Sequence, residues 1–334
     1  MTDQKQQPTL EIIDISKDDL ETAEALVKAA STLGFFYIEG SGFSQKDVAD
    51  AFKLSEDFFA EPVESKKSVI IDEGNHGYSS MNLEVLDPET QKKGDPKEAF
   101  NITQDKDGGL TMPLPPYLES HREETTDLWL KCHAVGVRIL ELLARGLHID
   151  EASGGETWLA TRHDPAKLSG SVLRFLYYPG QKSQDPETEI RAGAHTDYGT
   201  LTLLFQTAPG LEILSPVTKK WTPVPYIQSS TPGAAAPLVV NIADLLSFWS
   251  SGVLRSSIHR VKFPKEVQES GADRYSIVYF LHPQNSVPLE PIPSDIVRAA
   301  GTHRGSNAQK DGSYMTALQH LQKRLAATYG WKGY

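Results

Sequence analysis

The residues with the clearest chemical potential in this sequence are His195 and Asp197, which stand two positions apart in the segment 191–206. The residues that follow them alternate between polar and apolar types and are rich in strand formers, so we predict an extended segment. In a strand, side chains two positions apart point to the same face. The imidazole and the carboxylate could therefore bind one metal ion together.

A histidine two residues before an acid is weak evidence when it stands alone. With 10 histidines and 44 acidic residues in 334 positions, roughly one such pair is expected by chance, and the sequence contains three. The pairs at 121–123 and 148–150 lie at the start and the end of a helical pattern, where side chains two apart diverge by about 200 degrees. We interpret those residues as surface or capping groups, because only the pair at 195–197 has a strand-like context.

A third candidate ligand is His259, which lies in the short strand pattern of residues 254–261. Two imidazoles and one carboxylate form the facial triad that leaves three positions of an octahedral iron open. The next strand pattern carries Arg274 and Ser276, again on one face. A guanidinium beside a hydroxyl could hold a small carboxylate, although from its own segment alone Arg274 could equally be a surface cation.

The order and spacing of these residues resemble the isopenicillin N synthase-like family of Fe(II)- and 2-oxoglutarate-dependent oxygenases. The family pattern is His-x-Asp, a distal histidine, and then Arg-x-Ser. The resemblance covers nearly the whole chain, since residues 172–179 are similar to the strand before the motif and residues 239–244 to the stretch before the distal histidine. It implies a mostly β protein with flanking helices around a double-stranded β-helix, or jelly-roll, core.

The resemblance also implies a division of the chain into three parts. Residues 8–125 would form the amino-terminal region, in which a helix, a strand and a helix pack on the barrel. Residues 165–285 would form the catalytic jelly roll, and residues 286–334 a carboxy-terminal loop and helix. Short β patterns separated by turn residues between 169 and 283 suit an antiparallel jelly roll.

The activity that the resemblance implies is the oxidation of a small-molecule metabolite by hydroxylation, desaturation or ring closure. Fe(II) would be held by the two histidines and the aspartate, O2 would be a cosubstrate, and 2-oxoglutarate would be converted to succinate and CO2. The far carboxylate of 2-oxoglutarate would meet Arg274, Ser276 and the hydroxyl of Tyr178. The sequence departs from the family at Leu176, where a polar residue, commonly Asn, is often found.

Substrate contacts are predicted less directly. The segment 95–102 resembles one that lies near the mouth of the active site in the family, so Tyr78, Phe100 and Asn101 are candidates, with an ordinary edge strand as the alternative. Arg174 is a further candidate because it shares a strand face with Tyr178.

Two polar residues before the distal histidine have two interpretations. Asn241 and Asp244 could orient a group bound to the iron. They could also satisfy local backbone groups in a turn.

Three other functions compete with the oxygenase. A zinc hydrolase could use two histidines and one aspartate, but it would not need Arg274 and Ser276 on a neighbouring strand. An iron oxidase of the same fold, independent of 2-oxoglutarate, would bind its own substrate to that pair. A catalytically silent jelly-roll protein is the least favoured alternative, because all three ligands are present.

The composition limits the partners. A formal net charge of -11 and a pI near 5.4 argue against nucleic acid or an anionic membrane surface as a partner. No apolar run approaches a membrane span, and the first residues lack the apolar stretch of a signal peptide. A single cysteine, Cys132, excludes an intrachain disulfide. We therefore predict a cytoplasmic protein that acts on a small molecule.

The elements that must position these residues can also be predicted. Ser44, with Asp47 three residues later, predicts a helix start, and Gly34 predicts a helix end. Residues 65–109 are polar and are predicted to be mostly loop. The other predicted elements are a helix over 20–30, a strand over 35–38, a long helix over 128–146, a hairpin of 210–214 with 220–224, and a last helix over 314–325.

Overall fold

The computed structural model describes residues 10–87, 93–180, 190–301 and 312–329. Within these residues the strands are β1 Ile12–Asp14, β2 Phe35–Glu39, β3 Gly77–Ser79, β4 Glu98–Thr103, β5 Val172–Tyr178, β6 Ile190–His195, β7 Leu201–Gln206, β8 Leu211–Leu214, β9 Trp221–Pro223, β10 Leu238–Ile242, β11 His259–Lys262 and β12 Arg274–Leu281. The helices are α1 Leu20–Thr32, α2 Gln45–Ala60, α3 Val63–Lys66, α4 Pro116–Ser120, α5 Arg122–Gly146, α6 Asp244–Trp249, α7 Lys265–Ser270, α8 Asp295–Ala300 and α9 Ala317–Tyr329, and three short 3-10 helices span Glu151–Ser153, Gly155–Thr157 and Ala160–Arg162.

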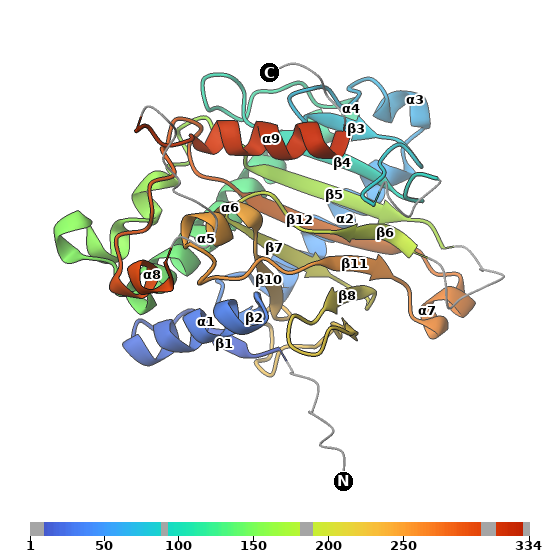
Figure 1. The fold of residues 1–334 in the computed structure, drawn as a ribbon. Helices are drawn as coiled ribbons and strands as arrows, with labels where there is room; N and C mark the ends of the chain where they lie inside the picture. The colour runs from blue at the N-terminus through green and yellow to red at the C-terminus, as the bar shows by residue number, and fades with distance from the viewer. Residues whose placement is uncertain (1–9, 88–92, 181–189, 302–311, 330–334) are drawn as a thin grey trace, which may run out of the picture.

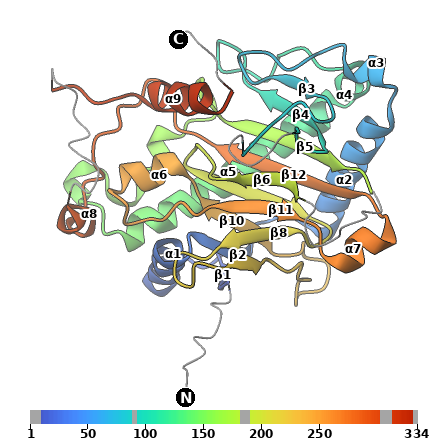
Figure 2. The ribbon, with the colours of Figure 1, turned by 45° about the vertical axis from the view of Figure 1, so that its right-hand side comes forward.

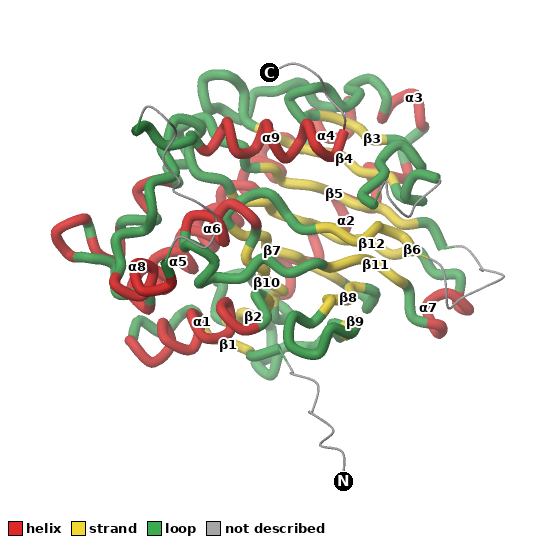
Figure 3. Tube along the Cα trace, viewed as in Figure 1, coloured by secondary structure: helices red, strands yellow, loops and turns green. Residues whose placement is uncertain are grey.

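The described strands form two sheets. The larger has the order β1-β2-β10-β7-β12-β5-β4-β3, and the smaller has the order β6-β11-β8-β9. All paired neighbours are antiparallel except β1 and β2. In Figure 1 the smaller sheet lies in front of the larger, and Figure 3 shows the same two layers of strands in yellow. The predicted jelly-roll core with flanking helices is confirmed.

Alternation along the central strands separates an inner face from a helix-covered outer face. On β12, Ser276, Val278 and Phe280 line an internal cavity, whereas Ile277 and Tyr279 are fully buried in the core that includes residues of α5. The same alternation places Arg174, Leu176 and Tyr178 of β5 and Thr202 and Leu204 of β7 on the inner face. Period-two patterning of the sequence therefore decides which side chains reach the cavity.

The long helix α5 lies against the outer face of the larger sheet. Figure 2 shows it behind β5 and β12, on the far side from the smaller sheet. Gly136 allows this close approach, because a Cβ atom there would meet Cδ2 of Leu281 at 2.8 Å. The indole of Trp129 packs edge to face on Tyr279, with ring centroids 5.3 Å apart. Cys132 is fully buried on this helix, and burial raises the pKa of its thiol.

The amino-terminal region supports the strand that carries the distal histidine. Gly34 ends α1 with a φ of 72°, and a Cβ there would lie 1.9 Å from the carbonyl oxygen of Arg255. Only glycine combines this left-handed conformation with so close an approach. The hydroxyl of Ser257 then donates to the carbonyl of Leu33 at 2.6 Å. The ring of Phe35 packs edge to face on the imidazole of His259, with ring centroids 5.3 Å apart.

The predicted start of α2 is confirmed as a capping box. The side chain of Ser44 accepts from the backbone N–H of Asp47, and the Asp47 carboxylate accepts from the backbone N–H of Ser44. The hairpin of β8 and β9 is also confirmed, and the last helix begins at Ala317, three residues later than predicted.

The described residues between 65 and 109 are mostly loop, as predicted, but they also contain β3 and β4, which pair with each other and extend the larger sheet beyond β5. The strand boundaries near the candidate ligands differ from the sequence-based expectation. The strand β6 ends at His195, so Asp197 lies just past the strand. The strand β7 begins at Leu201, and β11 begins at His259 itself.

Among the described helices, none has the length and apolar character needed to cross a membrane.

Candidate metal and cosubstrate site

The structure brings His195, Asp197 and His259 together. One ligand atom of each lies within 4.8 Å of the other two, and this is the metal-binding group found among the described residues. Oδ1 of Asp197 is 3.7 Å from Nε2 of His195 and 3.5 Å from Nε2 of His259. Pairing of β6 with β11 sets His195 opposite His259, and the loop after β6 turns Asp197 toward both rings.

Backbone carbonyls orient both imidazoles. Nδ1 of His195 lies 2.8 Å from the carbonyl oxygen of Gly193, and Nδ1 of His259 lies 3.2 Å from that of Ser257. A carbonyl can only accept a hydrogen bond, so each Nδ1 carries the proton and donates it. The lone pair of each neutral ring is then on Nε2, the atom that faces Asp197, which is the tautomer that a metal ion requires.

The second oxygen of Asp197 is held from the side of the larger sheet. The hydroxyl of Thr202 donates to Oδ2 at 2.6 Å, and the side-chain amide of Asn241 donates to it at 2.8 Å. These two bonds leave Oδ1 directed at the histidines. Asn241 therefore contacts a candidate iron ligand, which agrees with the first of its two interpretations. Asp244 instead begins α6, where its carboxylate accepts from the hydroxyl of Thr196 and pairs with Arg324.

Burial and mutual charge set the protonation of the three ligands. Burial lowers the pKa of His195 to about 4, and the neighbouring His259 adds to this effect. Burial raises the pKa of Asp197, but His259 and His195 together hold this pKa below its ordinary value. Burial also opposes the charge on His259, whose pKa is nevertheless raised by Asp197. At neutral pH Asp197 is therefore an anion and His195 a neutral ring, the forms in which both bind metals.

Arg274 and Ser276 lie on the inner face of β12, as predicted. Nη1 of Arg274 donates to the hydroxyl of Ser276 at 2.6 Å, and the guanidinium lies over the ring of Tyr178 at 5.3 Å from its centroid. Arg274 is 1% exposed, and among the described residues no carboxylate pairs with it. A buried guanidinium without an anion is costly, so this donor set fits a bound carboxylate.

The metal cluster and Arg274 face the same cavity of about 570 Å³. Its walls are mostly apolar and come from both sheets, from the segments 73–75, 84–86 and 103–106, and from α9. The lining residues of α9 include Leu318, Leu321 and Leu325. A cavity of this size and polarity is typical of a small-molecule site.

Contacts of Arg324 join α9 to the loop that carries the aspartate ligand. Nη2 of Arg324 lies 2.7 Å from the carboxylate of Asp244 and 3.1 Å from the hydroxyl of Thr196, the residue between His195 and Asp197. The same guanidinium lies 5.1 Å from the ring centroid of Tyr198. The helix is therefore tied to the loop that carries the aspartate ligand.

The predicted substrate residues divide into two groups. Arg174 lines the cavity. The other three are not among the described residues that line it: the hydroxyl of Tyr78 donates to Glu98, and the ring of Phe100 packs on Phe58. Asn101 donates from its amide to the side chain of Asn75 at 2.9 Å, and Asn75 does line the cavity.

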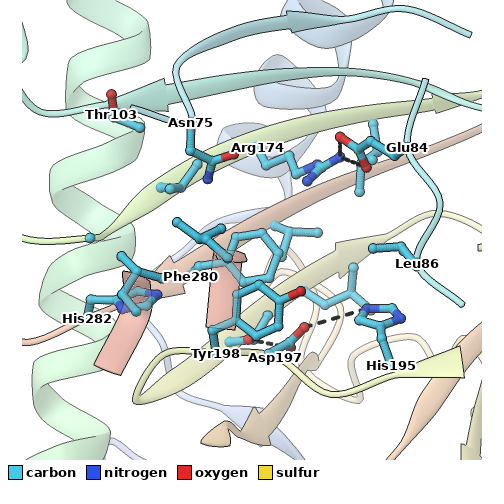
Figure 4. A pocket seen from close by; sticks show the side chains of 18 of the residues that line it. Asn75, Glu84, Leu86, Thr103, Arg174, His195, Asp197, Tyr198, Phe280 and His282 are labelled. Carbon is cyan, nitrogen blue, oxygen red and sulfur yellow. Dashed lines mark hydrogen bonds and ion pairs between the residues drawn. The ribbon is translucent and has the colours of Figure 1, made fainter. Parts of the chain in front are cut away.

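Several cavity residues were not singled out from the sequence. Figure 4 shows Arg174 and Glu84 across the pocket from His195 and Asp197, with Tyr198 and Phe280 between these groups in that view. Phe280 continues the alternation of Arg274 and Ser276, so period-two reasoning could have found it. Glu84 and Lys97 carry no such signal, because they come from an irregular polar segment.

The other two His-x-acid pairs lie away from the cluster, as predicted. Asp150 pairs with the exposed Arg298 at 3.0 Å, and His148 has a positive φ of 51°. Nδ1 of His121 lies 2.9 Å from the carbonyl oxygen of Tyr117. Neither pair is part of a metal-binding group within the described ranges.

Comparison with known families matches two segments of this chain. Residues 10–129 match the family described as the non-haem dioxygenase in morphine synthesis N-terminal region. Residues 169–283 match the 2OG-Fe(II) oxygenase superfamily. The second match contains the three candidate ligands, Arg274 and Ser276.

Individual relatives cover almost all of the chain. A UPF0676 protein of Schizosaccharomyces pombe is 32% identical over 334 residues, which is 96% of this chain and 94% of that protein. A proline hydroxylase of Petromyces alliaceus is 28% identical over 91% of this chain and 92% of its own length. A full-length Neurospora crassa protein, solved as a crystal structure in complex with alpha-KG and thymine, is 30% identical, with a TM-score of 0.76, and the match covers 96% of this chain and 97% of that one.

Proposed function

Because this chain belongs to the 2OG-Fe(II) oxygenase superfamily, in its isopenicillin N synthase-like branch, we propose that Fe(II) binds to His195, Asp197 and His259 and that 2-oxoglutarate binds beside it on Arg274 and Ser276. The protein is a non-haem Fe(II)- and 2-oxoglutarate-dependent dioxygenase that oxidises a small-molecule metabolite and releases succinate and CO2. The zinc hydrolase, the cosubstrate-independent oxidase and the silent binding protein are set aside.

One observation carries the ligand assignment. Three donor atoms converge within 4.8 Å, while the outer atoms of the same side chains are held by Gly193, Ser257, Thr202 and Asn241. Two neutral nitrogens and one carboxylate oxygen are the donor set that non-haem Fe(II) oxygenases use, with positions left for other ligands. The arrangement is formed by hydrogen bonds of the protein itself.

Fe(II) with 2-oxoglutarate and O2 supplies the oxidising chemistry, in which 2-oxoglutarate is converted to succinate and CO2 while the substrate is oxidised. The protein's residues bind, orient and exclude water. Thr202 and Asn241 keep the Asp197 carboxylate in one orientation, and the leucines of α9 cover the cavity. An apolar, covered cavity restricts water and strengthens the polar contacts inside it.

We assign the far carboxylate of 2-oxoglutarate to Arg274, the hydroxyl of Ser276 and the hydroxyl of Tyr178. All three residues line the cavity, and the β5–β12 register sets Tyr178 opposite Arg274. Leu176, which stands opposite Ser276, presents an apolar side chain at the position where the family often has a polar one. The cosubstrate would therefore be held by fewer polar contacts along β5 than in relatives that keep Asn.

For the substrate, we propose a small molecule with a flat ring. The solved Neurospora crassa relative binds thymine together with alpha-KG, which supports this size and shape. In this chain Tyr198 and Phe280 line the cavity and could pack on such a ring, and Arg174 and Asn75 could meet its polar edge. Asn101 would act through Asn75, while Tyr78 and Phe100 would support the wall from behind.

We further propose that residues 8–125, 165–285 and 286–334 are the working parts of this enzyme. The first would brace the jelly roll through Gly34 and Phe35. The second would carry the iron and cosubstrate residues. The third would cover the cavity with α9, through the contact of Arg324 with Thr196 and Asp244.

Anaerobic titration tests the assignment. We expect one Fe(II) per chain, and a weak visible absorption band that develops only when Fe(II) and 2-oxoglutarate are both present. A sample loaded with Zn(II) and 2-oxoglutarate is the matched control and should show no band. A protein that binds Fe(II) but gives no band and releases no succinate with any substrate would contradict the proposal.

A further inference from the structure

Glu84, Lys97 and Arg174 line the cavity and form, with Asp95, a cluster of four charged side chains that are buried or nearly buried. Nη2 of Arg174 contacts the Glu84 carboxylate at 2.5 Å. Nζ of Lys97 lies 3.3 Å from Glu84 and 2.6 Å from Asp95. The side chains are 11% exposed for Arg174, 4% for Glu84 and Lys97, and 0% for Asp95. Figure 4 shows the Arg174–Glu84 contact in the upper part of the pocket wall, across from His195 and Asp197.

The positive and negative charges of this cluster cancel. Two bases face two acids, and Asp95 is held further by the backbone N–H of Gly193, two residues before His195, at 3.0 Å. Burial would raise the pKa of Glu84, but Arg174 and Lys97 together lower it to about 2, so Glu84 is an anion at neutral pH. Outside the iron and cosubstrate positions, the described residues that line the cavity include three acids and three bases: Glu73, Glu84, Asp105, Lys97, Lys106 and Arg174.

The two arginines of the cavity therefore differ in what they can bind. Arg274 has no carboxylate partner within the described residues, and a ligand carboxylate would supply the missing charge. Arg174 already has Glu84. A ligand carboxylate brought to Arg174 would meet the Glu84 anion within a site of low polarity, where like charges repel strongly. A carbonyl or amide oxygen carries no net charge, so it is not repelled in this way, and it still accepts a hydrogen bond from Arg174.

We propose that Glu84 is a specificity-determining residue, which neutralises Arg174 and so restricts this end of the cavity to an uncharged polar edge of the substrate, such as a ring carbonyl or amide, and rejects carboxylates. The inference rests on the proposed function, because it concerns the substrate end of the same cavity. The same neutralisation would direct the far carboxylate of 2-oxoglutarate to Arg274 and away from Arg174.

The inference can be tested with matched pairs of ligands, of which one member is uncharged and the other carries a carboxylate. The full-length protein is loaded with Fe(II) and 2-oxoglutarate without O2 and titrated in a calorimeter with thymine and uracil-5-carboxylate, benzamide and benzoate, and nicotinamide and nicotinate. The wild type should bind the uncharged member more tightly by about tenfold or more, as expected for one uncompensated charge in a partly buried site.

Three variants locate the effect. Glu84→Gln leaves the cluster with one excess positive charge, so the carboxylate members should gain about tenfold or more in affinity relative to their uncharged partners. Lys97→Met removes a positive charge and should give the carboxylates no gain. Glu73→Gln is the matched control, because the same chemical change at the exposed rim should leave the ratio unchanged.

Tighter binding of the carboxylate members by the wild type would overturn the inference, as would a folded Glu84→Gln variant with the wild-type ratio. Absence of binding by all six compounds would also overturn it. The ratio of the two affinities is also measured on the wild type alone, so the inference can be tested even if the Glu84→Gln variant does not fold. The chelate absorption band, recorded on every sample, separates the two proposals: a normal band with an unaltered ratio contradicts only the role of Glu84.

Discussion

The cavity has two ends that are built in different ways. At the proposed cosubstrate end, the iron ligands and Arg274 lie on or next to strands of the two sheets, and Arg274 lacks an acidic partner among the described residues. At the substrate end, Glu84 and Asn75 come from irregular segments, and Arg174 is neutralised by Glu84. In the proposed assignment, the residues that hold Fe(II) and 2-oxoglutarate therefore lie on or next to regular strands, whereas Glu84 and Asn75, which we propose to lie near the substrate, come from loops.

The largest effect should follow from Asp197→Ala, because both Fe(II) binding and turnover depend on this carboxylate. Removing the carboxylate should abolish turnover and strongly weaken Fe(II) binding, because the remaining two imidazoles lose the anion between them. Iron content after desalting and succinate release measure the two losses. One iron per chain with full activity would show that the cosubstrate end has been misplaced.

The second prediction compares the two arginines by the same substitution. Arg274→Ala should weaken 2-oxoglutarate binding by about 2 to 4 kcal/mol, the cost of losing a charge-assisted contact, while one Fe(II) still binds. Arg174→Ala should leave the affinity for 2-oxoglutarate unchanged. Titration of the chelate absorption on both variants gives the numbers. Equal losses in the two variants would remove the distinction between the ends.

A third prediction concerns pH and the substrate end. The pKa of Glu84 falls from 4.5 to about 2 on folding, so this carboxylate contributes stability above pH 4.5 that is lost as the pH falls toward 2. The metal-free wild type should therefore be more stable than Glu84→Gln at pH 6, and this advantage, about 2 to 3 kcal/mol, should shrink between pH 4.5 and 2. Denaturant unfolding at each pH measures it. A constant difference across this range would indicate that Glu84 is not charged in the folded protein.

The smallest effect should come from the His-x-acid pair at 148–150. His148→Asn, which tolerates the positive φ, combined with Asp150→Ala removes the exposed ion pair with Arg298 and should cost at most about 1 kcal/mol of stability. The iron stoichiometry should stay near one. A folded variant free of iron would move the metal site to another part of the chain.

The placement of Arg274 and Ser276 on one face could be predicted from the sequence because these residues follow strand periodicity. Arg274 and Ser276 share a face through simple alternation, and the helix-capping pattern of Ser44 located α2. The contact of Asp197 with His195 could not come from strand geometry alone, because the strand stops at His195 and the loop completes the approach.

The substrate end was harder to predict. Glu84 contacts Arg174 across 90 positions of the sequence, and Lys97 joins the cluster through Glu84. No local periodicity encodes a contact over that separation. Tyr78 and Phe100 were candidates for the mouth because the segment 95–102 resembles one that lies there in the family, and the structure instead shows the alternative of ordinary strands, β3 and β4. As strands that extend the larger sheet, they turn these side chains into the layer behind the cavity.

The burial of Cys132 has a practical consequence for labelling. Its thiol is fully buried with a raised pKa, so it should not react with maleimides while the protein is folded. A thiol introduced at the exposed Lys323 of α9 would then be the reactive one, with no need to remove the native cysteine. A nitroxide spin label attached there would report the mobility of α9 with and without 2-oxoglutarate, on a chain that is otherwise wild type.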